Sequence, residues 1–168
     1  MSRNRCQIDA SPKRVFAVLA DPRTYAYWVV GSRRIRDFDD DWPAEGSAFH
    51  HAVGIGPLQV KDRTVVEAVD PPRMLRIKAK ARPLGTARVT LELRRRGRGT
   101  EVTMTEQAGD LATALIFNPV THLLVRGRNE LSLERLKSLA EGTVTMKDTD
   151  SPSRWDIRRH RSTADERR

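Results

Sequence analysis

One carboxylate in the sequence stands at a position suited to acid or base chemistry. The segment 100–108 alternates in polarity, which places Val102, Met104 and Glu106 on one face of a predicted strand. If that face is the inner one, Glu106 is an ionisable group in an apolar space, an environment that suits proton transfer. The other interpretation places Glu106 at the strand end, either solvated or paired with an arginine such as Arg63 or Arg88. Both remain open, because one β-bulge would exchange the two faces.

Two adjacent histidines are the other candidates for acid or base chemistry. His50 and His51 lie in a predicted strand, so their side chains point to opposite faces and one of them could enter the interior. Proton exchange with a ligand is one role for it, and a hydrogen-bonded structural histidine is the more common one. Adjacent residues of an extended strand cannot bind one metal ion together, and the single Cys6 adds no cluster. The sequence therefore predicts no metal site, and it contains no motif that predicts a cofactor.

Aromatic side chains are concentrated near the amino end. Tyr25, Tyr27 and Trp28 fall in a predicted short helix or turn, and Trp42 follows after the next strand. These rings could line the mouth of a pocket and offer flat surfaces to an aromatic or polyketide-like ligand. For Trp28 we favour a packing role, because two short helices resting on a sheet need a large apolar side chain between them.

The net charge of +9 is spread along the chain, apart from one arginine cluster. Four arginines lie between positions 94 and 98, around Gly97, in what the pattern predicts to be a hairpin turn. We expect a solvated loop there, and weak contact with the phosphates of an anionic membrane is the sharper hypothesis. The diffuse charge predicts no specific nucleic-acid partner.

The elements that position these residues follow from turn signals. Ser11 and Pro12 predict the start of a helix with a buried side formed by Val15 and Phe16, and a short helix around Tyr25 follows. Strands are predicted near 5–10, 33–40, 46–54, 57–69, 73–82, 86–96 and 100–108. The connections between the last six are too short for a crossover helix, so we expect a curved antiparallel meander with one apolar face.

A long helix is predicted over 110–141, with a break at Asn118-Pro119. Helical spacing predicts one apolar face formed by Val120, Leu123, Leu124, Gly127 and Leu131. A second, narrower strip consists of Val125, Leu133, Leu136 and Ala140. We expect the helix to cover the apolar face of the sheet, since no other predicted element is long enough to do so.

The domain is expected to span residues 1–142, followed by a flexible basic tail over 143–168. No run of about 18 apolar residues and no apolar signal core is present, so we expect a cytoplasmic protein. A monomer and a homodimer both remain open.

The opening residues carry a resemblance to a known family. Ile8-Asp9-Ala10-Ser11-Pro12, Leu19-Ala20-Asp21-Pro22 and Trp28-Val29 resemble the START-like superfamily, more narrowly its polyketide cyclase/dehydrase and lipid-transport group. Asp70-Pro71-Pro72-Arg73 and the closing helix fit the same pattern, over roughly residues 3–141. The resemblance implies an α+β helix-grip fold, with two short helices after the first strand and a seven-stranded sheet wrapped on the last helix. It further implies a deep cavity between sheet and helix.

The expected occupant of that cavity is a small or medium hydrophobic molecule such as a lipid or polyketide, held by a carrier or sensor. The alternative is a cyclase or dehydratase using an inward Glu106 or histidine as acid or base. The predicted lining comprises Tyr25, Trp28, Trp42, Leu75, Ile77, Val89, Leu91, Met104, Val120, Leu124, Gly127 and Leu131.

Overall fold

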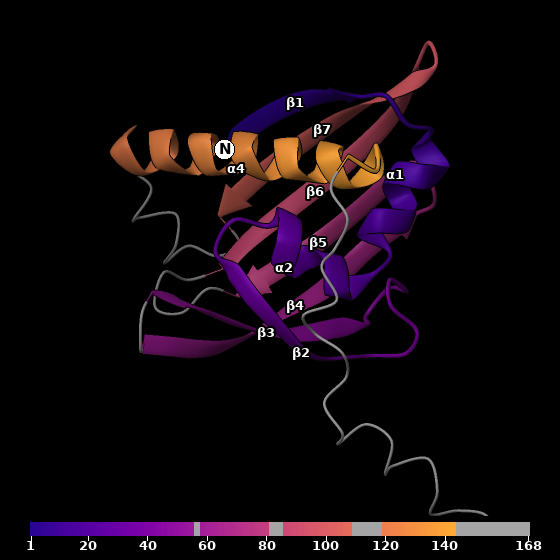
Figure 1. Ribbon diagram of the computed structural model, residues 1–168. Coiled ribbons are helices and arrows are strands. Elements are labelled where there is room, and N and C mark those ends of the chain that lie inside the picture. The colour runs from indigo at the N-terminus through magenta and orange to yellow at the C-terminus, as the bar shows by residue number, and fades with distance from the viewer. Residues whose placement is uncertain (56–57, 81–85, 109–118, 144–168) are drawn as a thin grey trace, which may run out of the picture.

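The computed structural model describes residues 1–55, 58–80, 86–108 and 119–143 (Figure 1). The strands are β1 (Ser2–Ile8), β2 (Ser32–Phe38), β3 (Ala48–Ile55), β4 (Leu58–Asp70), β5 (Met74–Lys80), β6 (Thr86–Arg96) and β7 (Gly99–Ala108). The helices are α1 (Pro12–Leu19), the 3-10 turn η1 (Pro22–Thr24), α2 (Tyr25–Trp28) and α4 (Pro119–Ala140). The predicted helical segment 111–117 and the tail from residue 144 lie outside the described residues.

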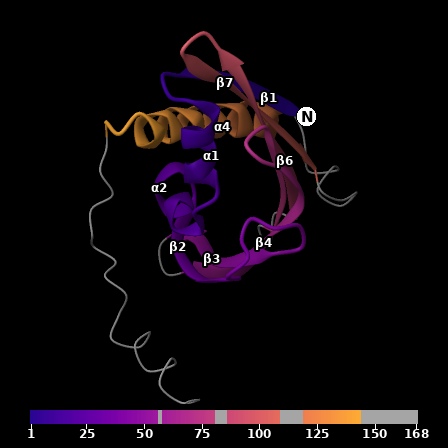
Figure 2. The same cartoon turned by 90° about the vertical axis from the view of Figure 1, so that its right-hand side faces the viewer.

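The seven strands form one antiparallel sheet in the order β1-β7-β6-β5-β4-β3-β2. Strands β2 to β6 each pair with the next strand along the chain, and β1 pairs with β7. The sheet curves, and α1, α2 and α4 lie on its inner side (Figure 2). The α+β helix-grip arrangement expected from the sequence is therefore confirmed.

Helix α1 begins and ends as its sequence predicts. The Oγ of Ser11 accepts a hydrogen bond from the backbone N–H of Arg14 (3.3 Å), and Pro12 occupies the first helical position. Four side chains of α1 are buried: Val15, Phe16, Val18 and Leu19. The carbonyl of Leu19 accepts hydrogen bonds from Tyr25 and Trp42, which satisfies an acceptor left open at the helix end. These two bonds tie the end of α1 to α2 and to the connection between β2 and β3.

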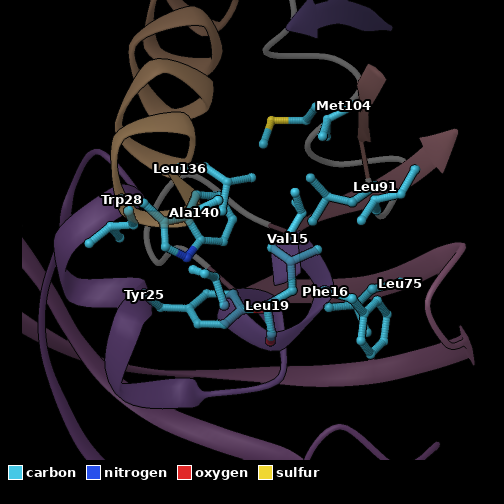
Figure 3. Packing of buried hydrophobic residues seen from close by; sticks show 14 of the residues in the cluster. Val15, Phe16, Leu19, Tyr25, Trp28, Leu75, Leu91, Met104, Leu136 and Ala140 are labelled. Carbon is cyan, nitrogen blue, oxygen red and sulfur yellow. The ribbon is translucent and has the colours of Figure 1, made fainter. Parts of the chain in front are cut away.

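The face of α4 that packs on the body is not the one that the sequence favoured. Leu133, Leu136 and Ala140 are buried in the hydrophobic core, beside side chains of α1 and α2 (Figure 3). The expected apolar face is instead open to solvent, with Leu123 at 72%, Leu124 at 68% and Leu131 at 42% exposure. Both strips satisfy helical spacing equally, so the contacts with α1, α2 and β1 decided between them.

The single apolar face predicted for the antiparallel sheet is confirmed in its central strands. Leu75, Ile77 and Leu91 are buried on the inner face, whereas Arg76 and Lys80 are exposed on the outer face. On that outer face the guanidinium of Arg88 donates to the carboxylate of Glu67 (2.5 and 2.9 Å). This contact assigns Arg88 to the opposite side of the sheet from the core.

Candidate ligand site

The inner face of the sheet presents aligned rows of apolar side chains with one carboxylate among them. The pairing registers place Val66, Ile77, Val89, Glu106 and Ser2 side by side on strands β4, β5, β6, β7 and β1. The next row in the direction of α1 consists of Val69, Leu75, Leu91, Met104 and Asn4. Glu106 therefore stands at the polar end of a hydrophobic row.

Glu106 lies on the inner face and is 3% exposed. Both of its carboxylate oxygens accept hydrogen bonds from the Nη2 of Arg128, at 2.7 and 2.5 Å. Its Oε2 also accepts from the Nδ2 of Asn129 at 2.8 Å. Of the two arrangements left open by the sequence, the inward one is observed, and the cation that pairs with Glu106 comes from α4 rather than from Arg63 or Arg88.

Further polar contacts bind α4 to β1 and to the end of α2. Asn4 donates to the backbone carbonyl of Arg126 (3.1 Å) and accepts from the hydroxyl of Ser2 (3.1 Å). The Oγ of Ser132 accepts from the backbone N–H of Val30 (3.1 Å). Buried polar groups are costly unless they are paired, so this network fixes the position of α4 over the edge of the sheet.

A comparison with protein families gives a match that covers most of the chain. The family described as polyketide cyclase/dehydrase and lipid transport matches residues 3–141. The chain belongs to this family. Membership in the polyketide cyclase/dehydrase and lipid-transport family indicates a fold that binds hydrophobic ligands. No functionally curated protein matches the chain.

Solved structures share the fold at low sequence identity. Protein MLL2253 from Mesorhizobium loti is 19% identical, with 85% of this chain and 98% of that chain covered and a TM-score of 0.64. Protein NE0264 from Nitrosomonas europaea is 16% identical, with 84% and 94% covered and a TM-score of 0.64. The Aha1 dimer from Colwellia psychrerythraea is 15% identical, with 83% and 95% covered and a TM-score of 0.59. At these identities the likeness shows the fold alone.

The aromatic side chains of this family member form an interior cluster rather than a pocket mouth. The ring of Tyr25 lies 4.9 Å from that of Trp28, 5.8 Å from that of Trp42 and 4.8 Å from that of Phe49. Tyr25 and Trp28 are almost fully buried, so a position at the mouth is wrong for Tyr25, whereas Trp28 packs in the interior, which is the role favoured for it (Figure 3). Burial raises the pKa of the Tyr25 phenol well above its usual value, so the hydroxyl stays a donor to Leu19.

Trp42 is buried in the same cluster, and one edge of it reaches a surface hollow. The hollow has a volume of about 260 Å³ and lies between the α1–η1 connection and the end of β2. Asp21, Arg23, Phe38 and Asp40 share its lining with Trp42. The ion pair between Arg23 and Asp21 (2.9 Å) already occupies part of this polar rim.

The structure places no described histidine side chain on the inner face of the sheet. His50 is exposed, and its neighbour Phe49 is buried in the aromatic cluster, so His50 points to the outer face. An acid or base role inside the sheet is therefore wrong for His50. The side chain of His51 lies outside the described part of the chain, and its role stays a prediction. Within that part, no group of three or more His, Cys, Asp or Glu side chains could hold a metal ion.

The lining residues predicted on α4 are the part of the site that the structure corrects. Leu124 and Leu131 are exposed, as is Gly127, because they lie on the side of α4 away from the core. The side chain of Val120 lies outside the described residues. The residues that α4 does contribute beside the sheet are Arg128 and Asn129.

The sequence prediction missed Arg128 and Asn129 because these polar residues interrupt the second apolar strip of the helix. Asn129 lies four residues before Leu133, on the same helix face, which is a usable signal. A polar side chain at an apolar position of a packed helix indicates a buried partner, and Glu106 was the one inward carboxylate proposed on the sheet.

Proposed function

We propose that this protein binds a small or medium-sized hydrophobic molecule between the inner face of the sheet and the first half of α4, as a carrier or sensor. One observation carries the proposal: the inner face is covered unevenly. Leu75 and Leu91 are fully buried beneath the helices, whereas Ala79, Ala87 and Val89 on the same strands are only half-buried. Apolar side chains left open beside a buried carboxylate are typical of a ligand site.

The contacts of the proposed ligand come from strands β5, β6 and β7. The residues concerned are Leu75, Ile77, Val89, Leu91 and Met104, with the aromatic cluster as the closed end. In this arrangement Glu106 and Arg128 form the polar end, where remaining guanidinium N–H groups could hold a carbonyl or hydroxyl oxygen of the ligand.

The first test is native mass spectrometry of freshly purified protein, followed by denaturing extraction. A co-purified apolar molecule at near-stoichiometric amount would support the proposal and name its chemical class. An empty protein would argue against a tight-binding carrier and leave weak binding to be measured by titration.

The titration uses the fluorescent fatty acid cis-parinaric acid with a matched pair of variants. Val89→Trp fills the proposed site from the inner face, whereas Thr90→Trp adds the same ring to the outer face, where Thr90 contacts Arg76. We expect Val89→Trp to weaken probe binding by about tenfold or more, and Thr90→Trp to leave it unchanged. Equal binding by both variants, with matching circular dichroism spectra and melting temperatures, would place the ligand elsewhere.

The cyclase or dehydratase alternative depends on Glu106, and its contacts favour binding over catalysis. Both carboxylate oxygens already accept hydrogen bonds from Arg128, and a proton taken from a substrate would disrupt them. Glu106→Gln discriminates between the two functions. A carrier with this substitution keeps most of its ligand affinity, whereas a polyketide cyclase loses its turnover.

A further inference from the structure

The stretch 123–131 of α4 carries an unusual concentration of exposed leucines. Five large hydrophobic side chains are exposed in the described part of the chain, and three of them are Leu123, Leu124 and Leu131. A fourth, Met1, precedes β1, which lies beside α4 through the hydrogen bond from Asn4 to the carbonyl of Arg126. Exposed apolar side chains that gather in this way mark an interaction surface.

Basic side chains surround these leucines. Within the stretch 123–131, Arg126 and Arg128 are exposed, against the single glutamate Glu130. Over its whole length α4 carries four Lys or Arg residues against two Glu, which gives the helix a net charge of +2. A surface that combines exposed leucines with positive charge is complementary to a layer that is apolar inside and anionic at its surface.

We propose that the exposed face of α4 over residues 123–131 is a docking surface for an anionic lipid bilayer. Leu123, Leu124 and Leu131 enter the boundary between headgroups and acyl chains, and Arg126 stays at the level of the lipid phosphates. The helix lies on the bilayer and does not cross it, since no described helix is long and apolar enough to span a membrane. The same stretch of α4 contributes Arg128 to Glu106, so docking sets the membrane beside the polar end of the inner face.

A second copy of the chain fits this surface less well than a bilayer does. Three leucines at these exposures offer a few hundred square ångströms at most, against about 800 Å² per partner in a standard stable interface. A two-fold contact would also bring the positively charged α4 of both copies together, which costs energy. A bilayer needs no such area, because each inserted side chain contributes independently.

The test is flotation of the full-length protein with vesicles of two compositions. One set contains phosphatidylcholine alone, and the other contains equal parts of phosphatidylcholine and phosphatidylserine. We expect the wild-type protein to float with the mixed vesicles, and less so as sodium chloride is raised, because salt screens the charges. The double variant Leu123→Asn/Leu124→Asn should lose at least about tenfold in partition, since both side chains would no longer leave water.

Two control variants separate this surface from others. Phe38→Asn removes an exposed apolar side chain of β2 (39% exposed), and Arg95→Gln/Arg98→Gln removes two of the four arginine charges at the β6–β7 hairpin. Both should bind vesicles like wild type. The proposal is overturned if wild type shows no preference for the mixed vesicles, or if the leucine variant still floats with them. It is equally overturned if the hairpin variant loses binding instead, or if sedimentation velocity shows a dimer that the leucine variant dissociates.

Docking and ligand binding have separate readouts. The leucine variant retains the inner face, so it should bind cis-parinaric acid in solution as wild type does. Failure of the ligand proposal would appear as absent probe binding with flotation intact, and failure of the docking proposal as the reverse.

Discussion

Replacing Arg128 with methionine tests whether the contact between α4 and β7 is a buried ion pair. The carboxylate of Glu106 is 4% exposed, so it depends on protein donors, whereas the side chain of Arg128 is 42% exposed. Methionine keeps most of the apolar stem and removes the cation. Glu106 then retains only the hydrogen bond from Asn129 among its described contacts. The substitution therefore leaves a buried charge largely uncompensated.

The magnitude follows from the unequal exposure of the two partners. Removing one partner of a fully buried pair costs about 3–5 kcal/mol, and a solvent-exposed pair contributes about 0.2–1 kcal/mol. With one partner buried and the other half-exposed, we expect Arg128→Met to lower the free energy of unfolding by about 2–3 kcal/mol at pH 7. For a domain of this size the melting temperature should fall by roughly 4–12 °C, measured by calorimetry or circular dichroism.

A double-mutant cycle identifies the source of the loss. Glu106→Leu combined with Arg128→Met removes both charges, so the double variant should be less destabilised than the sum of the two single variants, with a coupling of about 1 kcal/mol or more. Arg88→Met is the matched control, because Arg88 pairs with Glu67 on the solvent-exposed outer face, so its loss should destabilise the protein less than that of Arg128. An Arg128→Met variant no less stable than Arg88→Met, with no coupling to Glu106, would refute the assignment.

Two further predictions concern a close backbone contact and a surface ion pair. Gly99→Ala should destabilise the protein by about 1–3 kcal/mol, because a Cβ there would lie 2.3 Å from the carbonyl oxygen of Ile8. Gly127→Ala has open space around it and should stabilise α4 by about 0.5–1 kcal/mol in chemical denaturation. Equal effects of the two substitutions would contradict the β1–β7 packing. The hydrogen bond from Arg88 lowers the pKa of Glu67 below 4.5 in the folded protein, so its stabilising contribution is complete above pH 4.5 and is lost as the pH falls through the lowered value. Glu67→Gln should therefore reduce stability by about 0.2–1 kcal/mol at pH 7 and by less at pH 3, and a pH-independent difference would exclude this origin.

The sheet could be predicted because residues close together in the sequence specify its strands and turns. Alternation of Leu75 and Ile77 with Arg76 identifies a strand with one buried face, and short turns leave antiparallel pairing as the only option. The capping of α1 by Ser11 is local in the same sense, since one side chain and one backbone N–H three residues later are enough. Pairing of β1 with β7 joins residues about a hundred positions apart, and no local signal announces it.

The interior position of Glu106 depends partly on local sequence and partly on contacts between distant residues. Its alternation with Val102 and Met104 is a property of one strand, so the sequence alone placed these three side chains on one face. The position of α4 over the sheet decided whether this face is the inner one. It also decided which cation pairs with Glu106. The partner was Arg128, on a helix that the sequence predicted without indicating its rotation.

By itself the sequence determined the succession of elements, the antiparallel sheet, the two sides of each central strand and the existence of a long final helix. Each of these follows from spacing within one segment or between neighbours. Only the tertiary structure decided which face of α4 is buried, because two strips met the helical period equally well. Contacts with α1, α2 and β1 selected the strip of Leu133 and Leu136. That selection left Leu123 and Leu124 in solvent and brought Arg128 to Glu106, since one rotation of a rigid helix fixes all of its side chains together.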